Sequence, residues 1–104
     1  MATTKFYIPK TDAVIKCRNK REQDMALHFL LDIEIYAEIE ADGNDDYLWS
    51  RCETLDGYAH AMMWCGMIDG DAPRISAEYV SIIRELAADI KAGKTRNWYA
   101  PAEI

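Results

Sequence analysis

Two clusters of turn-forming residues divide most of this chain into segments of helical length. Asp42–Asp46 and Asp69–Pro73 combine aspartate, asparagine, glycine and proline, which favour turns over regular helix or strand. The segments around these clusters carry apolar residues at spacings of three and four, the period of one face of an α-helix. The sequence therefore predicts a mainly helical fold in which each helix buries an apolar stripe against its neighbours.

The two segments after Asp46 give the clearest helices. Their apolar stripes recur every three or four residues and comprise Leu48, Cys52, Leu55, Ala59 and Met62, then Tyr79, Ile82, Ile83, Leu86 and Ile90. Gly66 and Gly93 follow these stripes, and glycine is a common residue just after a helix end. Asp45 or Asp46 is expected to cap the start of the first of these helices, and Ser76 the start of the second.

Residues 25–41 fit two structures. Ala26, Phe29, Leu30, Ile33 and Ala37 lie on one helical stripe, yet residues 33–41 also alternate as an extra strand would. We favour one long helix because no glycine, proline or asparagine separates Leu31 from Ile33. Such a helix carries Met25, Ile35 and Ile39 away from its main stripe. A helix that is apolar on two sides is either central in the fold or part of an oligomer interface, which favours a homodimer over a monomer.

The N-terminal segment has the alternation of short strands. Residues 5–8 and 13–18 are β-prone, and Ile15 and Cys17 share one face of the second stretch. Asn19 is then a helix N-cap, with Glu22 three residues later in a capping-box-like pair. The expected fold is α+β, a β-hairpin followed by three helices. With 104 residues, we expect one domain with a hairpin arm (1–18), a helical body (19–93) and a tail (94–104).

The net charge of −6 is unevenly distributed along the chain. Residues 1–21 sum to +5, whereas residues 22–50 sum to −9 and contain no lysine or arginine. An acidic average is unusual for a non-specific nucleic-acid binder, and we expect no direct nucleic-acid contact. The acidic segment predicts instead a surface that binds a partner protein with a basic groove, because opposite charge speeds association. The candidate contact residues are Glu34, Glu38, Glu40, Asp42, Asp45 and Asp46.

The basic residues support an alternative, a small-ligand module that binds or sequesters a nucleotide. A phosphate would bind near the N-terminus of the first helix, and two aromatic residues of the tail would stack on a base. No glycine-rich phosphate loop accompanies these residues. The candidate ligand-binding residues are Lys16, Arg18, Lys20, Arg21, Trp98 and Tyr99.

Catalytic and metal-binding patterns are weak. The three cysteines and two histidines do not have the spacing of a zinc site, and three cysteines make a poor disulfide framework. The sequence contains no phosphate-loop, dinucleotide-binding, zinc-protease or nucleophile-elbow motif. We therefore expect neither an enzyme nor a cofactor or metal, and keep an enzyme or zinc protein as a third hypothesis. No apolar run is long enough to cross a membrane and no export signal is evident, so a cytoplasmic location is expected.

The C-terminal half carries one resemblance. The segment Gly57–Met62 leads through Gly66, Met67 and Ile68 to the segment Ser76–Leu86, a helix with a glycine stop followed by a capped helix. This arrangement covers about a third of the chain and resembles the C-terminal part of many small bacteriophage accessory proteins. The resemblance carries over no catalytic residue. It implies a class of short, acidic phage proteins that block a target in the bacterial host cytoplasm, with anti-CRISPR and other anti-defence inhibitors among its members.

Overall fold

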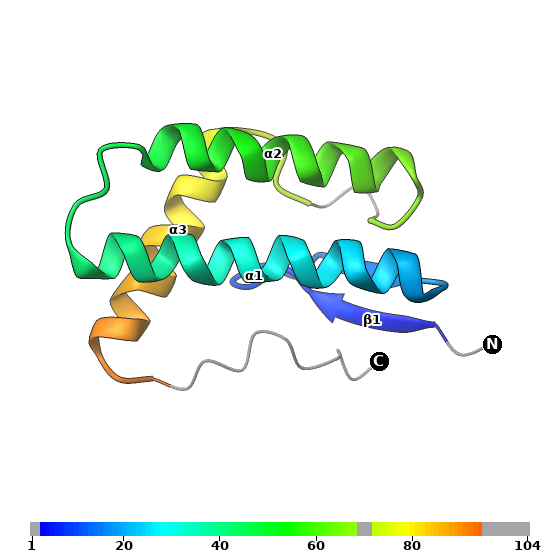
Figure 1. The fold of residues 1–104 in the computed structure, drawn as a ribbon, viewed down its shortest axis with the longest axis horizontal. Coiled ribbons are helices and arrows are strands. Elements are labelled where there is room, and N and C mark those ends of the chain that lie inside the picture. Colours follow the sequence, from blue (N-terminus) through cyan, green and yellow to red (C-terminus); the bar gives the residue numbers. More distant parts are fainter. Residues whose placement is uncertain (1–2, 69–71, 95–104) are drawn as a thin grey trace.

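The computed structural model describes residues 3–68 and 72–94. Over these residues the chain forms two strands and three helices (Figure 1), which is the predicted α+β fold. The elements are β1 (Thr4–Tyr7), β2 (Val14–Cys17), α1 (Lys20–Asp42), α2 (Leu48–Trp64) and α3 (Ser76–Lys91). Of the predicted tail, only Lys94 is among the described residues.

The two strands form an antiparallel hairpin that is tied to the end of α2. Thr4 pairs with Cys17 at one end of the ladder. Ile15 and Cys17 are buried while Lys16 is exposed, as the alternation predicted. Ile15 also forms an isolated bridge with Ile68, and the Lys16 N–H donates to the Met67 carbonyl at 2.6 Å. The hairpin therefore packs against the segment that follows α2.

Residues 33–41 belong to α1, so the alternative of an extra strand is wrong. Ile33 and Ala37 are fully buried one helical turn apart, whereas Ile35 and Ile39 are exposed. A strand would place Ile33, Ile35, Ala37 and Ile39 on the same face. These residues form a helix because Ile33 and Ala37, spaced by one helical turn, can both be buried against the core. No glycine or proline interrupts the helix near its centre.

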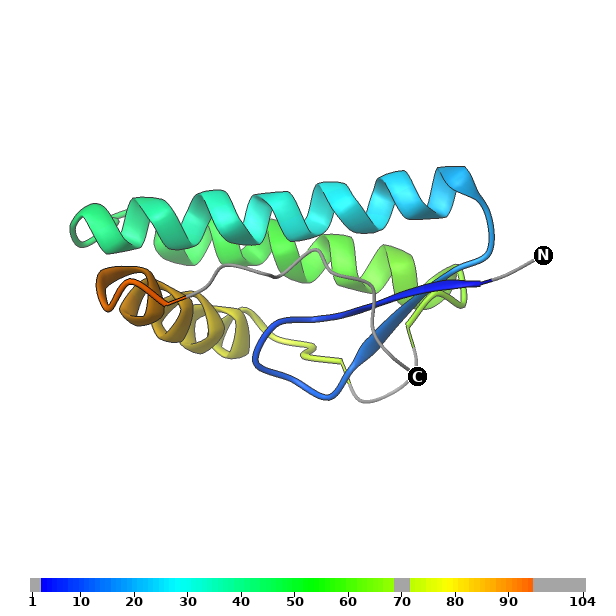
Figure 2. The same ribbon diagram turned by 90° about the horizontal axis from the view of Figure 1, so that it is seen from below.

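The three helices pack in two layers around one hydrophobic core. α1 and α2 lie side by side in opposite directions, and α3 crosses behind them (Figures 1 and 2). Phe29 of α1 meets Tyr79 of α3 edge to face, with ring centroids 6.2 Å apart. Both side chains are fully buried. Buried residues from all five elements belong to the same hydrophobic cluster.

Helix ends follow the sequence signals with two corrections. Asn19 caps α1, since its side chain accepts a hydrogen bond from the Glu22 N–H at 2.9 Å. Gly66 and Gly93 have φ values of 74° and 73° and close α2 and α3 with Schellman motifs. The predicted cap Ser76 is wrong, because Ile75 is the extended N-cap and Ser76 is the buried first residue of α3.

The second correction concerns α2. Its N-cap is Tyr47, which makes no side-chain capping bond, rather than Asp45 or Asp46. Asp45 instead accepts a hydrogen bond from the Tyr47 N–H at 3.0 Å, just before the helix begins. Asp45 therefore shapes the entry turn without capping the first turn. Across the described parts of the chain, none of the helices has the length and apolar character needed to cross a bilayer.

Candidate functional site

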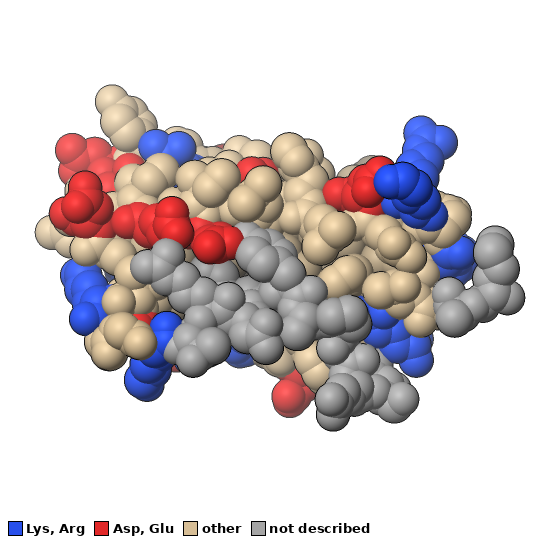
Figure 3. Space-filling view, turned by 60° about the horizontal axis from the view of Figure 1, so that its bottom comes forward, with Lys and Arg blue, Asp and Glu red and all other residues tan. Residues whose placement is uncertain are grey.

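The end of the molecule where α1 leads into α2 combines exposed acids with exposed aromatic rings. Glu38 and Asp42 lie on the last turns of α1, and Asp46 lies in the connecting turn; all three are exposed. Tyr47 and Trp49 follow directly and are 69% and 56% exposed. We call these five residues the acidic end. In Figure 3 acidic side chains gather toward one end of the long axis, while lysine and arginine occur at both ends.

Two of the six predicted acids hold this end together instead of facing solvent. The Asp45 carboxylate is 4% exposed and accepts the Nε–H of Arg51 at 2.7 Å as well as the Tyr47 N–H. The pKa of the Asp45 carboxyl is lowered, mainly by the hydrogen bond from the Tyr47 N–H and to a smaller extent by the contact with Arg51. Glu40 is buried, and its Oε2 lies 3.4 Å from the Asp45 N–H that donates to it. Both carboxylates thus support the turn, and Glu34 is half-buried on α1.

Arg51 connects this turn to the body of the helix pair. Its guanidinium lies 5.5 Å from the centre of the Tyr36 ring on α1 while its Nε binds Asp45. A cation over an aromatic face is attracted by the ring's electron-rich surface. Arg51 therefore fixes the start of α2 against α1, and Tyr47 and Trp49 lie at the same end of the helix pair as the exposed acids (Figure 1). The sequence reading missed these two aromatic residues, because nothing in their local pattern shows that they stay outside the core.

The predicted basic residues are divided between a structural role and an exposed surface. Arg18 donates to both carboxylate oxygens of Glu22, at 3.0 and 2.6 Å, and to the Cys65 carbonyl at 2.8 Å. The Arg18 backbone N–H also donates to Glu22 at 2.8 Å. The hydrogen bonds from the Arg18 side chain, and to a smaller extent the one from its backbone N–H, lower the pKa of the Glu22 carboxyl to about 2. Arg18 thus joins the start of α1 to the end of α2. Its guanidinium is engaged by Glu22 and the Cys65 carbonyl rather than presented to a ligand.

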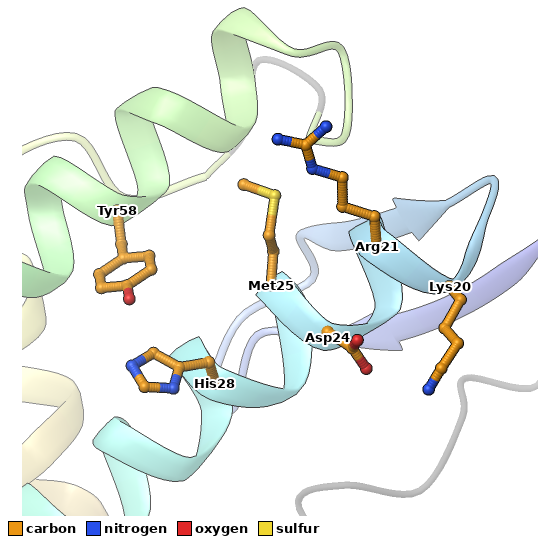
Figure 4. A pocket seen from close by; sticks show the side chains of 6 residues that line it. All are labelled: Lys20, Arg21, Asp24, Met25, His28 and Tyr58. Carbon is orange, nitrogen blue, oxygen red and sulfur yellow. The ribbon is translucent and has the colours of Figure 1, made fainter.

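The remaining predicted ligand residues are not gathered in one place. Lys16 is exposed on β2, and Lys20 and Arg21 are exposed on the first turn of α1. Lys20 and Arg21 point in different directions, Arg21 toward α2 and Lys20 away from it (Figure 4). Trp98 and Tyr99 lie outside the described residues.

Arg21 borders an open hollow of about 560 Å³ between α1 and α2. Met25 extends from α1 toward α2 beside Arg21, and the His28 and Tyr58 rings face each other with centroids 5.5 Å apart (Figure 4). Lys20, Arg21, Asp24, Met25, His28 and Tyr58 line this hollow. His28 and Tyr58 were not predicted as site residues, because they come together only through the packing of α1 on α2.

The thiols do not form a reactive centre in the described structure. Burial raises the pKa of both Cys17 and Cys52 to about 11, which keeps these thiols protonated at neutral pH. Cys65 is exposed at the end of α2. The Nδ1–H of His60 donates a hydrogen bond to the Asp56 carbonyl oxygen of its own helix, 2.8 Å away. Within residues 3–68 and 72–94, no three histidine, cysteine or acidic side chains are grouped so that they could hold a metal ion.

Comparison with known proteins gives no guide to function, so the acidic end and the hollow are the features from which a function is argued. No protein-family model, curated protein or solved structure matches this chain.

Proposed function

We propose that this protein is a non-enzymatic interaction protein that docks its acidic end onto a basic groove of a partner protein. The observation that carries the proposal is that Tyr47 and Trp49, both more than half exposed, lie at the same end of the molecule as the exposed acids Glu38, Asp42 and Asp46. Tyrosine and tryptophan are the residues most often responsible for binding energy at interfaces. The surrounding carboxylates would speed the encounter with a basic surface and favour it over an acidic one.

The specific form of this proposal is a phage-type inhibitor of a bacterial defence or nucleic-acid-handling complex. A groove built to bind phosphates presents lysine and arginine side chains. Carboxylates can occupy such a groove without being substrates. The resemblance to small phage accessory proteins supports this form, and the encounter would then take place in the cytoplasm of the bacterial host.

The experiment is a comparison of partner capture by matched charge-reversal variants. Tagged parent protein is used to capture partners from bacterial lysate, and captured proteins are identified by mass spectrometry. Asp42→Lys with Asp46→Lys should abolish capture of the partner, and Trp49→Ala should weaken it. The control is Glu53→Lys with Glu85→Lys, which makes the same change in net charge at exposed sites on α2 and α3.

Binding to the purified partner then tests the electrostatic mechanism. Association should slow as salt rises from 50 to 200 mM, since the charges are exposed and are screened over about 10 Å. Thermal unfolding should show that the acidic-end variants fold as stably as the control pair. Equal capture by the two charge-reversal variants would contradict the proposal.

The hollow beside Arg21 supports a second candidate function, the binding of a small nucleotide-like anion. Arg21 would hold a phosphate, and the His28 and Tyr58 rings would contact a planar base. A nucleotide present at 100 times its Kd should raise the free energy of unfolding by about 2.7 kcal/mol. Arg21→Ala should remove that effect, whereas Lys16→Ala, on β2, should not. A flat thermal-shift response to cyclic and linear nucleotides would remove this candidate.

A further inference from the structure

The face of α1 that points away from the core carries a row of exposed apolar side chains. Leu27, Leu31 and Ile35 are 38%, 45% and 41% exposed and follow one another at intervals of four residues. Side chains four apart form a continuous ridge on a helix, and such ridges pack into the grooves of another helix. On the opposite side of α1, Phe29 and Ile33 fill the core. The helix is thus apolar on two sides, and within residues 3–68 and 72–94 only one of these sides is buried.

We propose that this exposed face pairs with the same face of a second copy of the chain, with the two α1 helices antiparallel and crossing at Leu31. Leu31 is the midpoint of the 23-residue helix. A two-fold axis there brings Leu31 against Leu31 of the second copy, and Leu27 against Ile35 at both sides of the crossing. A surface that matches itself in this way is the property of a two-fold symmetric dimer.

The charges at the two ends of α1 fit this antiparallel arrangement. Lys20 is the first residue of the helix and Asp42 is the last, and both are exposed. Each is eleven residues from Leu31, about three turns, so both point within about 20° of the Leu31 direction. In an antiparallel pair Lys20 of each copy approaches Asp42 of the other. Asp24 and Glu38 also approach each other, so the apolar centre must supply most of the affinity.

The helix dipole favours the same orientation. The last turn of α1 contains no basic residue, so its exposed acids lie at the negative end of the dipole, which is unfavourable. An antiparallel second copy brings its positive N-terminal end, together with Lys20, to these acids. A parallel copy would place two acidic ends together and two basic ends together. Electrostatics therefore selects the antiparallel pair.

The interface is small, and this limits the strength of the dimer. Three half-exposed apolar side chains per copy contribute less than the roughly 800 Å² per partner of a standard interface. The expected Kd is therefore in the micromolar range. The inference does not rest on the proposed docking function. Glu38 and Asp42 belong to both surfaces, whereas Asp46, Tyr47 and Trp49 lie beyond the end of α1 and belong to the acidic end alone.

The first test is sedimentation equilibrium of the full chain at concentrations up to about 0.5 mM, well above a micromolar Kd. The parent should form a dimer, and Leu31→Glu should weaken it at least tenfold. The control is Ile75→Glu, which places the same charge at a side chain that is 55% exposed before α3; it should leave the dimer intact. A parent that is monomeric throughout, or a Leu31→Glu protein that dimerises as well as the control, would overturn the proposal.

Disulfide trapping tests the register and orientation, and it does not depend on the behaviour of Leu31→Glu. In a Cys65→Ser background, Leu31→Cys should form a cross-linked dimer on oxidation. Leu27→Cys mixed with Ile35→Cys should give a cross-linked heterodimer. Leu27→Cys alone should not, because like positions would be about 12 Å apart along the axis, beyond the reach of a disulfide. Efficient cross-linking of Leu27→Cys to itself would indicate a parallel pair and refute the antiparallel model.

The two proposals can fail independently. Loss of partner capture in the Asp46→Lys or Trp49→Ala single variants, with dimerisation unchanged, supports the acidic end alone. Loss of the dimer in Leu31→Glu, with partner capture unchanged, supports the α1 pairing alone.

Discussion

Replacement of Tyr79 by phenylalanine removes one hydroxyl group from the centre of the fold and leaves the ring in place. The Tyr79 side chain is fully buried, and its hydroxyl donates to the Pro73 carbonyl at 3.1 Å. This bond fixes the segment that enters α3. The phenylalanine ring would keep the edge-to-face contact with Phe29, so the substitution isolates the contribution of the hydrogen bond.

The expected loss of stability follows from the surroundings of the acceptor. A neutral hydrogen bond contributes about 0.5–1.5 kcal/mol, and a buried partner left unsatisfied raises the cost to about 1–3 kcal/mol. Pro73 is buried, so its carbonyl has little access to water once the hydroxyl is gone. We expect Tyr79→Phe to lower the free energy of unfolding by about 1–2 kcal/mol. For a domain of this size that corresponds to a fall in Tm of about 4–15 °C.

Urea unfolding at pH 7, followed by circular dichroism, measures this loss directly. The control is Tyr7→Phe, at a residue that is 44% exposed, which should change stability by less than about 0.5 kcal/mol. An equal effect of the two substitutions would refute the assignment of stability to the buried bond.

The same pair of variants predicts a pH effect. Burial raises the pKa of Tyr79 above its ordinary value of about 10. The unfolded chain therefore releases this proton more readily, and stability falls as the pH rises above about 10. Tyr79→Phe should lose less stability than the parent over that range. An alkaline stability profile that falls as steeply in Tyr79→Phe as in the parent would show that this hydroxyl does not titrate with folding.

The other predictions concern helix ends and titratable groups. Gly66→Ala should cost about 1–2 kcal/mol in urea unfolding, because Gly66 has a φ of 74°; Gly57→Ala should instead stabilise by about 0.5–1 kcal/mol, since a methyl group there meets nothing within 4 Å. Arg18 lowers the pKa of Glu22 to about 2, so the stabilisation from the ionised carboxylate is present above pH about 4.5 and is lost as the pH falls toward 2. Glu22→Gln should therefore make stability depend less on pH over this acid range. An unchanged acid range would contradict this. Cys52, with its pKa raised to about 11, should react with a thiol reagent at pH 8 only on unfolding, and rapid reaction in the native state would show that it is accessible.

Local patterns in the sequence predicted the order and type of the elements, although residues 33–41 also fitted a strand and only their burial pattern in the structure decided for the helix. The Asn19 and Glu22 pair marked the start of α1, and Gly66 and Gly93 marked the ends of α2 and α3. These signals are reliable because they satisfy backbone groups within a few residues of the same chain. The cap at Ser76 was wrong by one residue, because Ile75 takes the extended N-cap position and Ser76 is the buried first residue of α3.

The candidate site was predictable only in part, because exposure depends on contacts between distant segments. Six acids within thirteen residues looked equivalent in the sequence, yet Asp45 is sequestered by Arg51 and Glu40 is buried near it. Arg18 appeared to be a free cation and is instead shared between Glu22 and the end of α2. Tyr47 and Trp49 gained their significance only when the structure showed that they remain outside the core.

The sequence by itself determined an acidic α+β chain whose charge is segregated and whose helices begin and end at recognisable residues, because periodicity and capping act over one or two turns. Only the tertiary structure decided which charges remain available, which apolar side chains stay uncovered on α1, and which aromatic rings meet across the helices. Those properties depend on how α1, α2 and α3 pack together, and the free energy of burying one residue is set by neighbours that lie far away along the chain.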